Sequence, residues 1–229
     1  MNRLNIAIDG PAGAGKSTAA KAVAKKLGVR YLDTGAMYRA MALYVIRAGA
    51  DPGEAAAVER LLFEADIRVM FSEAGQRVFI GEEDVTGLIR TPEISMGASR
   101  VSAHPCVRVK LANMQRQVAE EYDVVMDGRD ITTNVLKDSP YKFFITASPE
   151  ERAKRRLLEL RSKGDETAAY ETVLEEMIQR DRQDTIRSFM PLTVAPDATV
   201  VDTTGMTVDQ VADTVLGVIA DTQTKLRNP

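Results

Sequence analysis

The amino-acid sequence predicts an α/β fold: a five-stranded parallel sheet flanked by helices, plus an inserted lobe with a small antiparallel sheet. Short apolar runs alternate with helical segments along the 229 residues, as is typical of a parallel sheet covered on both faces. Two other runs, 67–71 and 76–80, alternate apolar and polar residues around a turn. They predict a hairpin among helices, and we assign this hairpin to a lobe over the main sheet.

Each strand of the main sheet is expected at a short apolar run. The five runs are 4–8, 29–32, 123–126, 142–146 and 199–201. Apolar residues at helical spacing predict the helices. These are expected at 19–27, 35–48, 53–64, 92–102, 105–121, 149–162, 169–183 and 208–225.

Composition and charge exclude several classes of protein. Apolar residues make up 45% of the chain and charged residues 28%, which is enough for a sizeable core and argues against long disorder. The formal net charge of −3 argues against a general nucleic-acid binder, because such binding depends on phosphate neutralisation. The single cysteine, Cys106, excludes an intramolecular disulfide and a thiolate metal cage.

The first apolar stretch does not fit a signal peptide, because Asp9 and Gly10 interrupt it. No window reaches about 18 uncharged apolar residues, so we expect no membrane span. We therefore expect a soluble, cytoplasmic protein whose partners are neither membranes nor nucleic-acid polymers. The small size of the chain favours a monomer.

The most specific motif lies between the first apolar run and the first helix. Residues 10–17 fit the phosphate-loop pattern G-x-x-x-x-G-K-[ST], and they have the strand-to-helix context that this pattern requires. Glycines let backbone N–H groups turn toward an anion, and the helix start adds free donors and a positive dipole end. Lys16 is expected to reach the β- and γ-phosphates of ATP. The residues expected to bind ATP are Gly10, Ala12, Gly13, Ala14, Gly15, Lys16, Ser17 and Thr18.

A magnesium ion would accompany the triphosphate. The hydroxyl of Ser17 is the expected ligand from the loop. Asp127 follows the apolar run 123–126, and a carboxylate at the carboxyl end of a strand beside the loop can hold Mg²⁺ through water. We therefore expect Ser17 and Asp127 to form the protein's part of a metal site.

Transfer between two phosphates brings many negative charges together, and the acceptor oxygen is already anionic. Catalysis then depends on positioning and charge neutralisation, so several arginines and no Ser/His/Asp set are expected. The candidates are Arg39, Arg108, Arg129, Arg152, Arg156, Arg180 and Arg187. Arg155 and Arg161 are expected on a solvated helix face. The single histidine, His104, is expected at a helix cap.

Other nucleotide-binding classes lack their signatures. A GTPase switch would need the guanine-reading motif Asn-Lys-x-Asp, which does not occur. Segments 84–87 and 202–205 mimic a switch motif, but neither follows a credible partner loop. A motor ATPase would carry a catalytic carboxylate pair, whereas Asp127 is followed by Gly-Arg-Asp.

Several motifs together resemble the bacterial cytidylate kinases, also called CMP/dCMP kinases, over nearly the whole chain. They are the phosphate loop at 8–18, Leu-Asp-Thr-Gly-Ala-Met-Tyr-Arg at 32–39, Asp-Val-Thr-Gly-Leu-Ile-Arg-Thr at 84–91, Asp-Gly-Arg-Asp-Ile at 127–131, Glu-Arg-Ala-Lys-Arg-Arg at 151–156 and Asp-Thr-Thr-Gly-Met at 202–206. The resemblance implies one P-loop kinase domain, 1–229. It places a monophosphate-binding lobe at 50–100 and a short lid at 150–168. We expect the insert around 50–100 and the arginine-bearing helix near 152–165 to close over the substrates.

The resemblance also implies residue roles. In the acceptor site, Arg39, Arg129 and Arg187 would hold the CMP phosphate, and Thr34 is a further matched residue. The cytosine edge would be read by Ser99, Arg108 and Asp130. The ribose would be held by Arg180 and Asp184. On the donor side, Arg152 would lie against the adenine of ATP and Arg156 near the transferring phosphate. The expected catalytic residues are Lys16, Arg129, Arg156 and Arg187. An Asp acceptor beside an Arg donor can distinguish cytosine from uracil.

The chain departs from the family pattern at one position. Thr132 stands where the family usually has glycine, and threonine lacks glycine's conformational freedom. We therefore ask whether this loop keeps the family's backbone conformation and its fit to the acceptor.

The implied activity is transfer of the γ-phosphate of ATP to CMP and dCMP. Two alternatives stay open. One is a P-loop kinase for another small acceptor, such as an alcohol, with Asp33 or Asp130 as general base. The other is a nucleotide-binding regulator without turnover.

Overall fold

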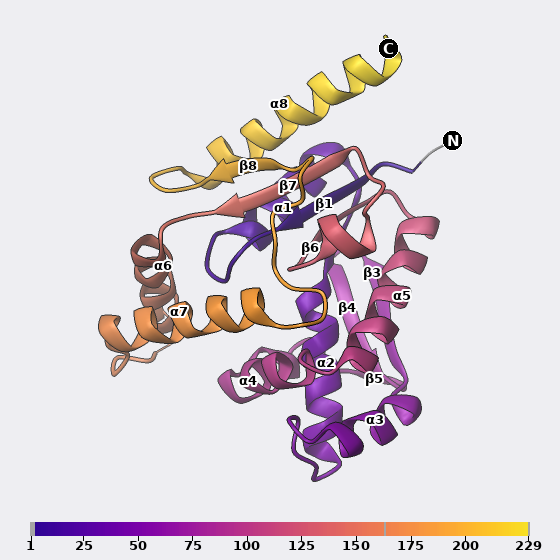
Figure 1. Cartoon of the computed structure of the whole chain (residues 1–229), viewed down its shortest axis with the longest axis vertical. Helices are drawn as coiled ribbons and strands as arrows, with labels where there is room; N and C mark the ends of the chain where they lie inside the picture. The colour runs from indigo at the N-terminus through magenta and orange to yellow at the C-terminus, as the bar shows by residue number, and fades with distance from the viewer. Residues whose placement is uncertain (1–2, 163, 229) are drawn as a thin grey trace. The chain divides into compact units, whose positions relative to one another are not determined.

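A computed structural model describes residues 3–162 and 164–228 of the chain (Figure 1). The chain divides into two compact units, each with residues from separated parts of the sequence. Of the described residues, the first unit comprises 3–4 and 30–124, and the second comprises 5–29, 125–162 and 164–228. Each unit is described by itself below.

The main sheet has five strands, as the sequence predicts. They are β1 (Asn5–Asp9), β2 (Arg30–Asp33), β6 (Val124–Asp127), β7 (Tyr141–Thr146) and β8 (Thr199–Asp202), in the order β2-β6-β1-β7-β8. The pairs β1–β7 and β7–β8 are parallel, with Ile8 opposite Phe143 and Phe143 opposite Thr199. The strands β1 and β6 are almost entirely buried, as expected for central strands of a covered sheet.

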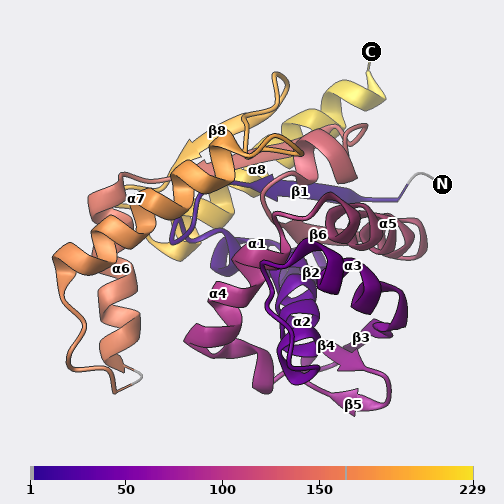
Figure 2. The ribbon, with the colours of Figure 1, turned by 60° about the horizontal axis from the view of Figure 1, so that its bottom comes forward.

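The helices of the second unit are α1 (Lys16–Leu27), α6 (Pro149–Ser162), α7 (Tyr170–Ile186) and α8 (Val208–Arg227). Figures 1 and 2 both show α6 and α7 side by side. Their contact is an apolar cluster of Ala153, Val173 and Met177. The helix α8 packs against α1 and starts with a capping box between Thr207 and Gln210, which satisfies two N-terminal donors.

The first unit contains the predicted hairpin. It consists of β3 (Ile67–Ser72) and β4 (Gly75–Ile80), paired antiparallel with Ile67 opposite Ile80. A two-residue third strand, β5 (Glu83–Asp84), extends this sheet. The helices are α2 (Thr34–Arg47), α3 (Ala55–Glu64), α4 (Pro92–Val101) and α5 (Pro105–Glu121), and Leu88–Arg90 form one 3₁₀ turn. In the described part of the chain, no helix is long and apolar enough to cross a membrane.

Candidate active site

The phosphate loop joins β1 to α1 in the second unit. Gly10 has a φ of 145° and Gly15, the N-cap residue of α1, a φ of 82°. A Cβ atom on Gly10 would collide with the carbonyl oxygen of Ile145 on β7. Only glycine fits this close approach and this backbone conformation, so the sequence motif and the observed turn agree.

Lys16 is buried at the start of α1. Its Nζ donates a hydrogen bond to the carbonyl oxygen of Pro11 at 2.6 Å. Burial and the positive charge of Arg129 lower the pKa of Lys16 to about 7, although Asp127, Asp9 and Asp184 act in the opposite direction. The ammonium is therefore poorly neutralised without a ligand, and phosphate oxygens would restore its charge.

Ser17 and Asp127 lie together as the sequence predicts. The Oγ atom of Ser17 donates to Oδ2 of Asp127 at 2.6 Å, and Asp127 is buried at the end of β6. Mg²⁺ is bound in kinases through one or two protein oxygens together with substrate phosphates. This pair of oxygen ligands fits that requirement. Among the described residues, no group of three His, Cys, Asp or Glu side chains could hold a metal ion.

Three residues that are predicted to bind the acceptor nucleotide lie together, one in the segment after β6 and two on or directly after α7. Nε of Arg129 lies 2.8 Å from Oδ2 of Asp184, and Nη1 of Arg187 lies 3.4 Å from Oδ1 of the same carboxylate. Nε of Arg187 donates to the carbonyl oxygen of Met190 at 2.6 Å. Burial raises the pKa of Asp184, but the charges of Arg129, Arg187 and Arg180 give a net lowering. Asp184 is thus an ionised carboxylate between two guanidinium groups.

Arg152 is a buried tether of the phosphate loop. Its guanidinium donates to the carbonyl oxygens of Ala147 and Ala12, each at 3.0 Å, and lies 2.7 Å from Oδ2 of Asp181 on α7. Arg156 instead pairs with Glu159 at 2.8 Å in a half-exposed position, and Arg180 is exposed. The structure therefore places the three predicted arginines of α6 and α7 in different environments.

The expectation for Arg155 is wrong. Its guanidinium donates to Oγ1 and the carbonyl oxygen of Thr203, at 3.0 and 2.8 Å, and pairs with Glu151. Thr203 in turn donates from its hydroxyl to the carbonyl oxygen of Ala14 in the phosphate loop at 3.1 Å. Helical charge spacing shows only the Glu151 pair, and Thr203 is 48 residues distant in sequence, so the solvated face was the natural sequence-based expectation.

A cavity of about 160 Å³ lies beside the phosphate loop. It is lined by Ala14, Gly15, Thr18, Ala19, Arg155, Thr203, Met206, Val208 and Val211. The cavity has the mixed character of a small-molecule site, with apolar walls and a few polar groups. Sequence reasoning gave Thr203 no role: segment 202–206 was used as one of the family motifs and 202–205 was discounted as a switch motif, but neither pattern shows a contact with Arg155.

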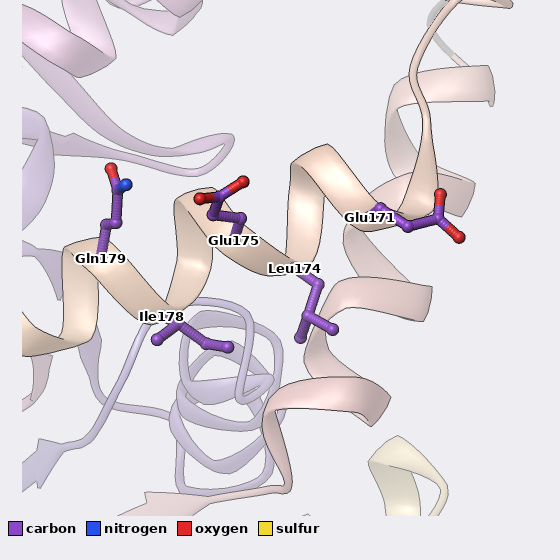
Figure 3. Close-up of a pocket in the computed structure, with 5 residues that line it drawn as sticks. All are labelled: Glu171, Leu174, Glu175, Ile178 and Gln179. Carbon is purple, nitrogen blue, oxygen red and sulfur yellow. The ribbon is translucent and has the colours of Figure 1, made fainter.

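A second hollow, of about 330 Å³, contains none of the predicted residues. Figure 3 shows its lining, which comes from α7 alone: Glu171, Leu174, Glu175, Ile178 and Gln179. Two carboxylates and no cationic side chain line it, so it is unsuited to phosphate.

In the first unit, Asp33 organises the predicted phosphate ligand Arg39. Oδ1 of Asp33 caps α2 by accepting from the backbone N–H of Ala36 at 3.0 Å, and Oδ2 lies 2.7 Å from Nη2 of Arg39. Arg90 from the 3₁₀ turn lies 3.8 Å from the same oxygen. Thr34 is buried at the first position of α2.

The hairpin holds the backbone of Asp33 through one side-chain amide. Oε1 of Gln76 accepts from the Asp33 N–H at 2.6 Å, and Nε2 donates to the Asp33 carbonyl oxygen at 3.2 Å. These two hydrogen bonds engage the N–H and the carbonyl oxygen of one residue, as the backbone of a neighbouring strand does in a sheet. Sequence reasoning did not identify Gln76, because no motif marks it.

The predicted base-reading residues of the first unit lie on α4 and α5. Arg108 is 2% exposed, donates to the carbonyl oxygen of Ser102 and lies with its guanidinium carbon 5.7 Å from the Tyr38 ring centroid. Ser99 is partly buried on α4. His104 is the N-cap residue of α5, as expected, but its ring nitrogen meets the carbonyl oxygen of Pro52 rather than capping the helix.

In the segment after β6, Thr132 has a conformation that does not require glycine. Among the described residues, Met190 is the only non-glycine residue with a positive φ, so Thr132 has a backbone conformation open to any residue. The chain continues as one π-helical turn, Ile131–Val135. Asp130 is buried and accepts from Nδ2 of Asn134 at 3.2 Å.

Comparisons with known proteins agree with the motifs. The family model described as cytidylate kinase matches residues 6–221. A cytidylate kinase from Caldicellulosiruptor bescii is 47% identical over 216 residues, which cover 94% of this chain and 95% of the relative. A cytidylate kinase from Mycobacterium leprae is 49% identical and matches over 90% of this chain and 91% of the relative.

A solved structure supports the fold at lower similarity. An uncharacterised protein from Eubacterium ventriosum superposes with a TM-score of 0.52 at 17% identity, covering 96% of this chain and 99% of that protein.

Proposed function

Because this chain belongs to the cytidylate kinase family, we propose that it transfers the γ-phosphate of ATP to CMP and dCMP, giving CDP or dCDP and ADP. The observation that carries this proposal is the charge network of the second unit. Lys16 of the phosphate loop interacts electrostatically with Arg129, Asp127 and Asp184. Lys16, expected to hold the donor phosphates, and Arg129, expected to hold the acceptor phosphate, thus share one electrostatic environment within the second unit.

The donor triphosphate binds the N–H groups of residues 10–18 and the ammonium of Lys16. Ser17 and Asp127 would hold Mg²⁺, which would neutralise charge on the donor phosphates. Arg152 stays in the donor site through its bond to Ala12. The cavity beside the loop, walled by Arg155, offers the adenine an apolar surface.

The acceptor phosphate binds Arg39, Arg129 and Arg187, and Arg180 and Asp184 hold the ribose. Ser99, Arg108 and Asp130 read the cytosine edge. Arg156 leaves its exposed pair with Glu159 to reach the transferring phosphoryl group. The acceptor oxygen is anionic, so the reaction needs alignment and charge neutralisation rather than a general base. A cytoplasmic location and a monomeric state complete this proposal.

A coupled assay of ADP release over CMP, dCMP, UMP, AMP and GMP tests the proposal. We expect the highest kcat/KM with CMP or dCMP, because a wrong base leaves buried polar groups unpaired. Equal or greater turnover of UMP or AMP contradicts the cytosine specificity. Phosphorylation of a metabolite alcohol alone indicates a different acceptor, and ATP binding without ADP release from any acceptor indicates a regulator.

A further inference from the structure

Asp9 is a buried carboxylate to which sequence reasoning gave no role. It ends β1, directly before Gly10 of the phosphate loop, and its exposed fraction is 0%. A buried carboxylate is costly unless hydrogen-bond donors satisfy it, so its partners indicate what it does.

Three donors converge on this carboxylate from one segment. The backbone N–H of Ile131 donates to Oδ1 at 2.9 Å, while the backbone N–H and the hydroxyl of Thr132 donate to Oδ2 at 2.7 and 2.6 Å. Asp9 and Thr132 are 123 residues apart in sequence. The contact therefore ties the end of β1 to the segment that directly follows Arg129 and Asp130.

The same segment is fixed again on its far side. The carbonyl oxygen of Asp130 accepts from the N–H groups of Asn134 and Val135, at 3.0 and 3.3 Å, in the π-helical turn. Gly128, on the near side, donates its N–H to the carbonyl oxygen of Ile8 on β1 at 3.0 Å. Arg129 and Asp130 thus lie between two attachments to β1, one at Ile8 and the other at Asp9.

The hydroxyl bond depends on the threonine at position 132, where the family usually has glycine. A glycine at position 132 could supply the backbone N–H but no hydroxyl, and Thr132 is 1% exposed, so no water replaces the missing donor without rearrangement. Hydrogen bonds to a charged acceptor are stronger than neutral ones. The substitution that departs from the family pattern therefore adds a third donor to Asp9.

We propose that Asp9 and Thr132 are positioning residues that hold Arg129 and Asp130 in the geometry required to bind the acceptor nucleotide. The inference deepens the proposed function and rests on it. Asp9 acts through its three hydrogen bonds rather than by contact with the substrates. Loosening this attachment should weaken acceptor binding selectively, because the donor triphosphate is held by the separate loop at 10–18.

The test compares T132A, which removes only the hydroxyl and keeps the N–H bond, with T132S, which restores the hydroxyl. We expect T132A to raise the KM for CMP roughly tenfold, the equivalent of one hydrogen bond to a charged group, with the KM for ATP within about twofold of wild type. T132S should return the KM for CMP to within about threefold of wild type. The matched control is T222A on α8, which removes a hydroxyl bonded to the Val218 carbonyl oxygen.

Each outcome of this test either supports or overturns the inference. The inference is overturned if T132A alters both KM values equally, alters neither, or only lowers thermal stability as T222A does. If the wild-type protein lacks CMP kinase activity, the proposed function fails, and this result is distinct from a failure of the inference, which hydrogen exchange tests without any activity. Hydrogen exchange on the wild-type protein should show the amides of Ile131 and Thr132 protected like those of β1, and rapid exchange at both overturns the inference even if T132A does not fold.

Discussion

At the scale of single residues, Lys16 is held in an unfavourable state by the fold. Its pKa of about 7, lowered first by burial and then by Arg129, means that the folded state binds this proton less tightly than the unfolded chain. Stability from this group therefore rises as the pH increases from about 7 to 10.5, and below pH 7 the buried charge is a cost. A residue kept at such a cost is typical of a functional site.

We expect Lys16→Ala to lower kcat by at least about a hundredfold, because it removes a charge that neutralises the transferring phosphoryl group. The thermal midpoint at about pH 6.5, below the pKa of Lys16, should be at least as high as that of wild type, since the variant also removes a buried charge. Steady-state kinetics and circular dichroism melts check the two parts. Lys21→Ala on an exposed position of α1 is the control, and retained turnover in Lys16→Ala would contradict the assigned role.

The titration of Asp9 makes the stability of the protein depend on pH in the direction opposite to that of Lys16. Burial raises the pKa of Asp9 to about 6, with a smaller contribution from Asp130, despite the hydrogen bonds from Thr132 and Ile131 that lower it. The folded state therefore binds this proton more tightly than the unfolded chain does. The resulting stability is fully present below pH 3.8 and is lost as the pH rises through about 6.

Urea unfolding of wild type and Asp9→Asn at about pH 5 and pH 8 tests this titration. The asparagine side chain of the variant cannot titrate, so the stability of wild type relative to the variant should fall by about 1 kcal/mol between the two pH values. Lys16 and Asp130, the charged groups that act on Asp9, are present in both proteins. An equal difference at the two pH values would show that Asp9 keeps an ordinary pKa.

At the scale of elements, regular strands and helices could be predicted because their hydrophobic periods are local. The hairpin β3–β4 and the phosphate loop with α1 lie where the sequence places them. The elements that were missed are the two-residue strand β5, the 3₁₀ turn Leu88–Arg90 and the π-helical turn 131–135. All three are too short to have a hydrophobic period of their own. The π-helical turn also has a partner distant in the sequence, because Thr132 donates to Asp9 across 123 residues.

In the candidate site, too, local sequence patterns could be predicted and contacts between distant residues could not. The predicted phosphate and metal ligands Lys16, Ser17 and Asp127 follow from a motif and a strand end. The contacts of Asp9 with Thr132 and of Gln76 with Asp33 could not be predicted, because each joins residues that only the folded backbone brings together. For the same reason, the sequence could not reveal that Arg155 binds Thr203.

The contact of Gln76 with Asp33 predicts that the hairpin affects the acceptor site. In Gln76→Ala, the backbone of Asp33 loses both bonds to the hairpin, so its hold on Arg39 should weaken. We expect the KM for CMP to rise roughly three- to tenfold, with little change in the KM for ATP. Gln117→Ala, on an exposed position of α5 in the same unit, is the control. An unchanged KM for CMP would make Gln76 a purely structural residue.

At the scale of the whole molecule, we expect segments 50–100 and 152–165 to close over the substrates. Closure excludes water and so prevents hydrolysis of ATP in place of transfer. Hydrogen exchange in both segments should slow when CMP and a non-hydrolysable ATP analogue are bound together, and change less with either alone. The helix α8 serves as an internal reference. Unaltered exchange in both segments with both ligands present would rule out this closure.

The ion pairs of Asp184 have a consequence for the catalytic cycle. The carboxylate stands between Arg129 and Arg187, so these cations keep an internal counter-ion when no nucleotide is bound. If these arginines bind the acceptor phosphate as proposed, the arriving phosphate exchanges with Asp184 or joins it, and the departing product leaves no uncompensated positive patch that attracts salt anions. The affinity for the acceptor should accordingly vary less with potassium chloride concentration than the number of arginines alone would suggest.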